Sequence, residues 1–333
     1  MNKRIAILIC AVLLLSILAG CGKSETETAP PADGKKLSIV TTIFPEYDWV
    51  MQLLGDRAAN VDVTMLLDSG VDLHSFQPSA KDIVTISDCD LFVYVGGESD
   101  KWVEAALAGA ANKDMVVLDL LEILREQVKE EEIIEGMDAH EEEEHDEHGE
   151  EPEYDEHVWL SLRNAGIVCQ ALRDALISLD EANKDVYTAN ADAYLQKLDA
   201  LDKQYQQAVD SSDVKTLLFG DRFPFRYLTD DYGLNYYAAF PGCSAETEAS
   251  FETIVFLANK LKELALPHVM TLEGSDGKIA QTIVDTAAVP EISILSMNSM
   301  QSCTMKDVSE GVTYLSVMES NLEALQQALN REG

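Results

Sequence analysis

Two histidines lie at positions where an α/β protein could hold a metal ion. His74 is in a loop that directly follows a predicted strand, Val61–Leu66. In open α/β sheets ligands bind at the carboxyl ends of strands, so this imidazole is a candidate ligand. His157 comes just before a predicted helix, and its neighbours Asp155 and Glu156 could orient the ring and raise its basicity. Each histidine taken alone is also compatible with a structural or exposed side chain.

Acidic residues and further histidines extend the set of candidate ligands. Glu273 follows the predicted strand His268–Leu272, so its carboxylate would face a cleft at the end of that strand or simply begin a loop. Residues 130–156 contain sixteen acidic side chains, three histidines and no Lys or Arg, which predicts a mobile, solvated loop. Imidazoles and carboxylates on such a segment can bind zinc weakly and exchange it quickly. The candidate secondary ligands in this loop are His140, His145 and His148.

Known catalytic motifs do not account for these residues. The segment from His140 to His145 is not the metalloprotease pattern H-E-x-x-H, because its histidines are five residues apart rather than four. The sequence contains no P-loop, no Rossmann glycine pattern and no G-x-S-x-G elbow. A zinc hydrolase is the enzymatic alternative, and it would need a base such as Glu156 or Glu246 beside a metal-bound water. We expect a binding protein and not an enzyme.

The strands and helices that must position these residues alternate along the chain, which predicts parallel α/β sheets. The first alternation covers residues 36–165, an N-terminal lobe that includes the acidic loop. Its predicted strands are Leu37–Thr42, Val61–Leu66, Leu91–Val95 and Met115–Leu118. Its predicted helices are Phe44–Leu54, Ala80–Ser87 and Trp102–Ala108.

A helical region at residues 166–212 separates this lobe from a second alternation. Within it, Glu181–Val209 has no Gly or Pro and would extend roughly 43 Å as a helix, long enough to hold two lobes rigidly. Residues 213–333 form the second lobe, with predicted strands Lys215–Phe219, Tyr236–Phe240, His268–Leu272 and Ile292–Leu295. The predicted fold class is α/β, with two lobes, each a mostly parallel sheet flanked by helices, joined by one long rigid helix.

The N-terminus predicts export and a lipid anchor. Lys3 and Arg4 precede an almost wholly apolar run, Ile5–Leu18, which is about as long as a signal-peptide core and short for a spanning helix. The small residues before Cys21 are similar to a bacterial lipobox, so residues 1–20 would be removed and Cys21 lipidated. A plain signal peptide or a membrane anchor is the alternative. Residues 21–35 are polar and predict a disordered tether, which places the folded chain outside the cytoplasm at the cell membrane.

The net charge limits the partners of the protein. The chain has 24 Lys and Arg residues against 60 Asp and Glu residues, which gives a net charge of −36. Such a surface attracts neither nucleic acid nor an anionic membrane through a basic patch, whereas it is compatible with the capture of cations. We therefore expect no nucleic-acid partner.

Four cysteines lie in the chain beyond Cys21. Cys89 is beside a strand-like run and Cys169 is on the apolar face of a predicted helix, which indicates buried thiols. Cys243 and Cys303 lie in loop-like segments, so in an oxidising compartment they are the candidate disulfide. Because the sequence has no C-x-x-C pair, a zinc site built on thiolates is not expected.

Several segments together resemble the metal-binding (zinc/manganese, cluster A-I) solute-binding lipoproteins of bacterial ABC importers, over nearly the whole chain. TTIFPEYDWVMQLLGD is similar to the opening strand and helix of that family, and VTYLSVMESNLEAL to its closing helix. LLDSGVDLHSFQPSAKDI and DEHVWLSLRNA resemble its first two ligand motifs, which places His74 and His157 at metal-binding histidines. LEGSDGKIAQTIVDTA resembles the fourth ligand segment and places Glu273 at the acidic ligand. A His- and acid-rich insertion before the second motif is typical of the zinc-type members.

The resemblance implies a metal site in the cleft between the two lobes and modest movement on binding. It implies a monomer that delivers Zn²⁺ as a transported ligand to an ABC permease. Two histidines plus carboxylates also suit Mn²⁺ or Fe²⁺, although the Irving–Williams order favours zinc over manganese. A surface adhesin or a passive metal buffer is a further alternative.

One segment departs from the pattern of the family. The third ligand is usually a histidine, or a glutamate in some manganese members, and the resemblance places Arg222 at that position. Arginine is always protonated and cannot bind a metal. Asp221 would supply the ligand if the loop shifts, or water or a loop histidine would complete the set.

Overall fold

The first predicted alternation forms a four-stranded parallel sheet in the order β2-β1-β3-β4. The structure is a computed structural model that describes residues 36–138, 153–244 and 248–331. The strands are β1 (Leu37–Thr41), β2 (Val61–Met65), β3 (Leu91–Tyr94) and β4 (Val116–Asp119). The helices are α2 (Phe44–Leu54), α3 (Ala80–Asp88), α4 (Trp102–Ala108) and α5 (Leu120–Leu124). The central strands are apolar because they are buried on both faces, and Ile39 and Phe92 are 0% exposed.

The second alternation repeats this topology with the strand order β6-β5-β7-β8, again with parallel pairs. The strands are β5 (Thr216–Phe223), β6 (Asn235–Pro241), β7 (His268–Leu272) and β8 (Ser293–Met297). The helices are α8 (Arg226–Tyr232), α9 (Phe251–Glu263), α10 (Lys278–Ala287), α11 (Met305–Ser309) and α12 (Tyr314–Leu329). In both sheets the loops that follow the strands gather at the carboxyl edge, where ligands bind in folds of this class.

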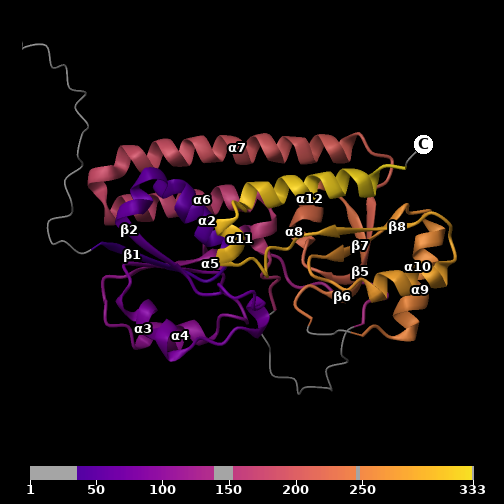
Figure 1. Cartoon of the computed structure of the whole chain (residues 1–333), viewed down its shortest axis with the longest axis horizontal. Helices are drawn as coiled ribbons and strands as arrows, with labels where there is room; N and C mark the ends of the chain where they lie inside the picture. The colour runs from indigo at the N-terminus through magenta and orange to yellow at the C-terminus, as the bar shows by residue number, and fades with distance from the viewer. Residues whose placement is uncertain (1–35, 139–152, 245–247, 332–333) are drawn as a thin grey trace, which may run out of the picture. The chain divides into compact units, whose positions relative to one another are not determined.

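One long helix, α7 (Lys184–Asp210), connects the two sheets (Figure 1). It packs against α2 and α6 (Leu162–Leu179) of the first half and against α12 of the second. Its buried residues recur every three or four positions, as expected for one apolar face: Tyr187, Ala191, Tyr194, Leu198, Leu201, Tyr205 and Val209. Asn190 donates a hydrogen bond to the carbonyl of Leu53 in α2 (2.9 Å), and the Tyr205 hydroxyl donates to the carbonyl of Met318 in α12 (2.6 Å). The predicted two α/β lobes and their long connecting helix are confirmed.

β5 is longer than predicted, because it continues beyond residue 219 to Phe223 with an irregular register against β6. Gly220 permits this path, since a Cβ atom there would lie 2.5 Å from Cα of Ala280 in α10. Asp221 and Arg222 are therefore on the end of a strand and not in a free loop, and their backbone cannot shift easily.

Several predictions concern residues outside the described ranges. These are the signal peptide (1–20), the lipid anchor at Cys21, the tether (21–35) and the loop histidines His140, His145 and His148. The boundaries proposed between the lobes also stay predictions. In the part of the chain that the structure describes, no helix is both long and apolar enough to cross a membrane.

Two buried carboxylates in segments that follow β1 and β3 should make stability depend on pH. Glu46 is 0% exposed and Asp100 is 4% exposed, and one oxygen of each lacks a hydrogen-bond partner. Burial, and then the charge of Asp100, raise the pKa of Glu46. Burial, reinforced by the nearby Glu156 carboxylate, raises the pKa of Asp100 to about 7. Ionisation of Asp100 therefore favours the unfolded chain, and the free energy of unfolding should fall between pH ~4 and pH ~7.

Asp100→Asn should remove this part of the pH dependence. An amide oxygen still accepts the hydrogen bond from the Gly96 N–H but carries no charge. Metal-free variant and parent should have similar stability near pH 4, and the variant should be more stable by about 2–4 kcal/mol near pH 8. Urea denaturation across this range measures the difference, with the exposed Asp276→Asn as the matched control. Parallel curves for the parent and Asp100→Asn would contradict the assignment.

Candidate metal centre

His74 is held at the carboxyl end of the first sheet by a short turn. It lies in a 3-10 turn, Leu73–Ser75, and its backbone N–H donates to Asp72 Oδ1 (3.0 Å). Its Nδ1 lies 2.9 Å from Ser99 Oγ and 3.3 Å from Glu156 Oε2. Because Nδ1 is occupied by these partners, Nε2 is the nitrogen available to a metal.

Glu156 and Ser99 form the support behind His74. The Ser99 N–H donates to Glu156 Oε1 (2.8 Å) and the Ser99 hydroxyl donates to Oε2 (2.5 Å). Gly97 has φ +80° and makes room for this carboxylate, since a Cβ there would lie 2.5 Å from Oε1. Burial raises the pKa of Glu156, but the hydrogen bonds from His74 and Ser99 outweigh it and hold this pKa below its ordinary value. An ionised Glu156 favours the proton on Nδ1 of His74 and so leaves a lone pair on Nε2.

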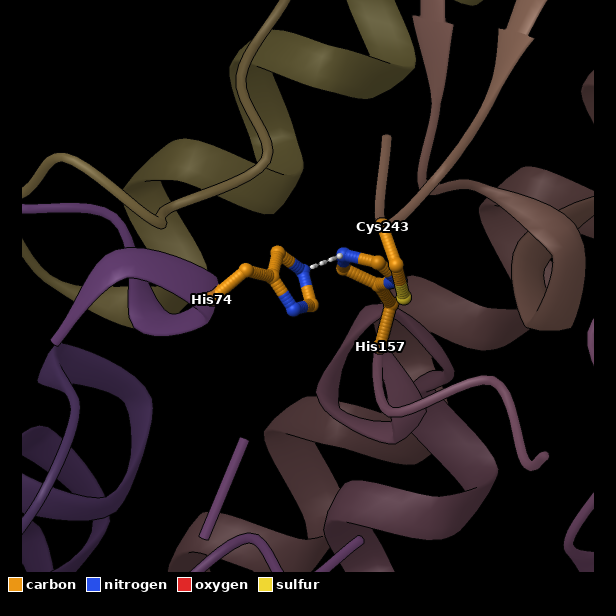
Figure 2. Close-up of side chains that lie close together, drawn as sticks. All are labelled: His74, His157 and Cys243. Carbon is orange, nitrogen blue, oxygen red and sulfur yellow. Dashed lines mark hydrogen bonds between the residues drawn. The ribbon is translucent and has the colours of Figure 1, made fainter. Parts of the chain in front are cut away.

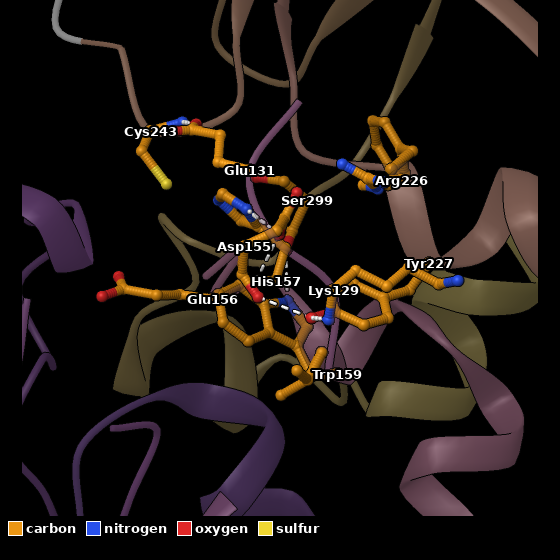
Figure 3. A network of polar contacts seen from close by, with 12 residues as sticks. Lys129, Glu131, Asp155, Glu156, His157, Trp159, Arg226, Tyr227, Cys243 and Ser299 are labelled. Carbon is orange, nitrogen blue, oxygen red and sulfur yellow. Dashed lines mark hydrogen bonds and ion pairs between the residues drawn. The ribbon is translucent and has the colours of Figure 1, made fainter. Parts of the chain in front are cut away.

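His157 is completely buried and is oriented by its own neighbour. Its backbone N–H and its Nδ1 both lie 2.9 Å from Asp155 Oδ1. The Tyr227 hydroxyl donates to the carbonyl of Asp155 (2.7 Å) and in turn accepts from the Lys129 N–H (3.1 Å), as Figure 3 shows. The acidic neighbour predicted to orient this ring thus contacts Nδ1, and Nε2 is again the nitrogen that faces the site.

The two Nε2 atoms point toward each other, 3.2 Å apart (Figure 2). Two imidazole nitrogens bound to one zinc ion at 2.0–2.1 Å with tetrahedral angles lie roughly 3.3 Å apart. The observed separation therefore matches one edge of a zinc coordination tetrahedron. The structure brings together His74 and His157, the two histidines singled out in the sequence.

A cysteine completes this group of donor atoms. His74, His157 and Cys243 each place one potential ligand atom within 4.8 Å of the other two. Cys243 follows β6, so the second half of the chain supplies it. Figure 2 shows its sulfur beside the ring of His157. No sequence motif predicted a thiol ligand here, because Cys243 is not part of a C-x-x-C pair.

Gln301 is a site residue that sequence reasoning missed. Its side chain is 5% exposed, and its Nε2 lies 3.1 Å from Nε2 of His74 and 2.9 Å from Nε2 of His157. Gln301 lies in the turn that follows β8. The preceding residue, Met300, has φ +65°, a strained backbone conformation within this turn. Rotation of the amide would present Oε1 instead of Nε2 to a metal. The rule that selected Glu273, a polar residue after a second-lobe strand, could also have selected Gln301.

Gln301→Glu should tighten zinc binding, because an anionic carboxylate replaces a neutral amide that already faces both histidines. We expect the affinity to rise about 10-fold and the zinc-free protein to lose stability, since a buried carboxylate then lacks its cation. Thermal denaturation with and without zinc would show both effects as a larger zinc-induced rise in Tm. Gln281→Glu, on the surface of α10, is the matched control. Unchanged affinity would mean that Gln301 does not face the bound metal.

Glu273 and Asp221 do not belong to the group of donor atoms formed by the described side chains. Glu273 accepts hydrogen bonds from the N–H (2.8 Å) and the hydroxyl (2.7 Å) of Ser299, two residues before Gln301. Burial raises the pKa of Glu273 although these hydrogen bonds oppose it. Asp221 accepts from the N–H of Leu272 (3.2 Å) and from that of Arg222 (2.9 Å). Both carboxylates thus stabilise backbone near the site, and their roles as ligands stay predictions.

Arg222 connects the second sheet to the His74 turn. Its Nη2 lies 3.0 Å from Asp72 Oδ2, and its Nη1 donates to the carbonyl of Ser244 (3.3 Å). Burial raises the pKa of Asp72, but the charges of Arg222 and His74 outweigh this effect and lower that pKa. Arg222 therefore ties together the segments that carry His74 and Cys243.

The predicted disulfide between Cys243 and Cys303 is wrong, because both residues have free thiols in the structure. The sulfur of Cys243 lies beside the histidines, whereas Cys303 is 7% exposed in the segment before α11. Burial, and then the carboxylate of Glu273, raise the pKa of Cys303 to about 12. Cys89 and Cys169 are buried, as predicted.

A cleft of about 960 Å³ is lined by His74 and Cys243 of the donor group. Asp72 and His74 line it from the first half of the chain, and Cys243, Glu248 and Glu273 from the second. The site is therefore at the junction of the two sheets, where acidic side chains attract a cation.

The sequence and the structure are both similar to known zinc-binding proteins. Residues 39–328 match the family described as zinc-uptake complex component A, periplasmic (ZnuA). The zinc-binding lipoprotein AdcA of Streptococcus pneumoniae serotype 4 is 32% identical over 336 residues, 99% of this chain and 62% of that protein. The chain thus spans less than two thirds of the length of this relative. The high-affinity zinc uptake system protein ZnuA of Bacillus subtilis is 30% identical over 323 residues, 94% of each chain.

Solved structures give the same result. The Zn(II)-bound ZnuA-like domain of Streptococcus pneumoniae AdcA matches with a TM-score of 0.68 and 30% identity, covering 89% of this chain and 100% of that domain. The metal-dependent lipoprotein YcdH of Bacillus subtilis matches with a TM-score of 0.70 and 27% identity, covering 89% of this chain and 100% of that protein.

Proposed function

Because this chain belongs to the family of the periplasmic component A of zinc-uptake complexes, we propose that it captures Zn²⁺ outside the cytoplasm for an ABC permease in the membrane. The observation that carries this proposal is the pair of Nε2 atoms 3.2 Å apart. Each ring has its Nδ1 next to a carboxylate, from Glu156 or Asp155, so both Nε2 lone pairs are directed into one point.

The same geometry supports zinc above the alternative metals. Mn²⁺ and Fe²⁺ accept imidazole but favour more oxygen ligands and higher coordination numbers than zinc. The donor group here consists of two imidazoles and a thiol, a set suited to four-coordinate zinc. The alternative is that the protein binds manganese or iron(II) in the same transport role. Competition of these ions with zinc for the purified protein decides between the metals.

Burial supports a role in binding rather than in catalysis. A zinc hydrolase needs an open coordination position, a metal-bound water and space for a substrate. His157 is 0% exposed, and the Gln301 amide lies against both Nε2 atoms, so only His74 of the two histidines lines the cleft. These contacts support a role in binding, and we propose that role rather than catalysis.

We also propose roles in zinc capture for Cys21 and for the histidines of the acidic loop. Lipidation at Cys21 would hold the protein at the outer face of the membrane as a monomer beside the permease. His140, His145 and His148 would collect zinc ions weakly and pass them to the cleft. An adhesin or a passive buffer would need the same lipid anchor but no permease.

Metal content and competitive affinity of the purified protein test the proposal. We expect one tightly bound zinc per chain, with manganese and iron(II) unable to displace it at equal concentration. In cells, deletion of the gene should prevent growth when zinc is scarce, and added zinc should restore growth. Absence of tight zinc binding would overturn zinc capture, and normal growth of the deletion strain in scarce zinc would overturn transport.

A further inference from the structure

Cys243 is the one member of the donor group whose role the family resemblance leaves unassigned. It belongs to the second half of the chain, whereas His74 and His157 both belong to the first. One potential ligand atom of each residue nevertheless lies within 4.8 Å of the other two. For two nitrogens and a sulfur bound to one tetrahedral zinc ion, the nitrogen–sulfur separations are roughly 3.5 Å. The separations in the structure, none above 4.8 Å, therefore exceed the bonded value by at most about 1.3 Å.

The backbone before Cys243 is packed directly on the ring of His157. A Cβ atom at Gly242 would lie 2.9 Å from Cε1 of that ring and 3.0 Å from the carbonyl oxygen of Phe223. Only glycine permits this approach, because any side chain would push the segment off the imidazole. The Cys243 N–H also donates to Glu131 Oε1 (3.2 Å), as Figure 3 shows. These two contacts hold the thiol beside the histidines.

The other candidates for a third ligand have different partners. Arg222 is paired with Asp72 and cannot bind a metal. Its Nη1 donates to the carbonyl of Ser244, the residue after Cys243, and so secures the loop that carries the thiol. Asp221 accepts hydrogen bonds from two backbone N–H groups of its own sheet. Beside the Gln301 amide, Cys243 is thus the second-half residue that the structure places at the histidines, and its thiol can become an anionic ligand.

We propose that the Cys243 thiolate is the third protein ligand of the captured zinc ion, beside His74 and His157, with Gln301 facing the fourth position. This inference rests on the proposed function, because it names the ligand set of the same site. When zinc binds, a Zn–S bond forms and the S–H bond breaks, and the proton passes to solvent. No electrons are transferred and zinc stays Zn²⁺.

Carboxylates surround the group of donor atoms. Glu131 accepts from the Cys243 N–H, Asp155 lies against Nδ1 of His157, and Glu156 lies against Nδ1 of His74. These negative charges attract a divalent ion, and they would stabilise a loaded site of one thiolate and two neutral imidazoles.

A thiolate ligand also determines which metals the site prefers. Soft sulfur ligands favour zinc over manganese, which prefers carboxylate and water oxygens. The discrimination against manganese should therefore depend on Cys243. A site with only imidazole and oxygen ligands would discriminate less between these two ions.

Cobalt substitution tests the inference, with Cys243→Ser as the variant and Cys303→Ser as the matched control. Cys303 is a free, buried thiol outside the donor group, so its loss should not affect the metal. We expect Co²⁺ to give an intense near-ultraviolet thiolate-to-metal band in the parent and in Cys303→Ser but not in Cys243→Ser. Zinc affinity should fall roughly 100-fold in Cys243→Ser, with less preference for zinc over manganese.

X-ray absorption at the zinc edge of the unmodified protein provides a test without a variant. The zinc-loaded protein should show one sulfur neighbour at about 2.3 Å from the metal. Tight zinc binding without a thiolate band, without a sulfur neighbour and with equal affinity in Cys243→Ser would overturn this inference and leave zinc capture intact. A parent protein that binds no zinc would overturn the proposed function itself.

Discussion

His157→Ala is expected to abolish tight zinc binding, with a loss of affinity of at least about 1,000-fold. The variant removes a nitrogen ligand that is completely buried and that lies 3.2 Å from Nε2 of His74. It also leaves Asp155 Oδ1 without the Nδ1 partner that accounts for the orientation of the ring. Apart from His74, no imidazole in the described ranges lies in this group of donor atoms, so none can replace His157.

Competition with a chromogenic chelator measures this loss of affinity. His268→Ala is the matched control, because His268 is on β7 with its Nδ1 next to Ser293 Oγ (2.6 Å) and is outside the donor group. His74→Ala should give a similar loss with less effect on folding, since His74 is on a surface turn and is 13% exposed in its side chain. Retention of zinc within tenfold of the parent in both His157→Ala and His74→Ala would contradict the site.

Trp159→Ala should lower the free energy of unfolding by about 3–5 kcal/mol. Trp159 is 1% exposed and its Nε1 donates to the carbonyl of Ser299 (2.8 Å), so it joins the His157 segment to the turn that carries Gln301. Its own carbonyl accepts from the Tyr314 hydroxyl (2.7 Å) at the start of α12. Truncation would create a cavity between these segments, so zinc affinity should also fall, by about 10-fold.

Trp159→Phe separates packing from hydrogen bonding at the same position. In the parent, the ring centroids of Trp159 and His157 are 5.3 Å apart, and the variant keeps an aromatic ring at this position. It removes the indole N–H that donates to the Ser299 carbonyl. We expect a loss of about 1–2 kcal/mol, clearly smaller than that of the alanine variant. Urea denaturation of the metal-free proteins provides these values, with Trp49 and Trp102 left as fluorescent probes. A cost below about 1 kcal/mol for Trp159→Ala would show that the residue does not connect these segments.

The fold could be predicted from sequence because its signals are local. Alternating apolar runs and helical spacing identified β1 to β8 and the long helix α7, whose buried face repeats every three or four residues. The end of β5 could not be predicted, because its extension depends on Gly220 meeting Ala280 of a helix about 60 residues away. That close approach is a tertiary contact, and no local pattern encodes it.

The candidate site could be predicted only in part. His74 and His157 are imidazoles next to recognisable loops, and their position at the carboxyl edge follows from the parallel sheets. Cys243 was interpreted as half of a disulfide, because sequence spacing does not show that Gly242 packs on His157. Gln301 carries no charge and matches no metal motif, so it became visible only through its contacts with both rings.

The position of Glu273 could be predicted from sequence, but the direction of its side chain could not. The sequence placed it correctly after the strand that is now β7, at the edge where ligands bind. The direction of its side chain depends on the Ser299 turn, which donates two hydrogen bonds to the carboxylate. Ser299 follows β8, a different strand. The two hydrogen-bond donors of Ser299 could therefore not be identified from the residues next to Glu273 in the chain.

Crystals of the zinc-loaded protein, measured on both sides of the zinc absorption edge, locate the bound metal. We expect one strong anomalous peak within about 2.0–2.1 Å of Nε2 of His74 and of His157, and about 2.3 Å from the sulfur of Cys243. A peak held instead by Glu273 or Asp221 without these histidines, or the absence of any ordered zinc in the cleft, would contradict this expectation.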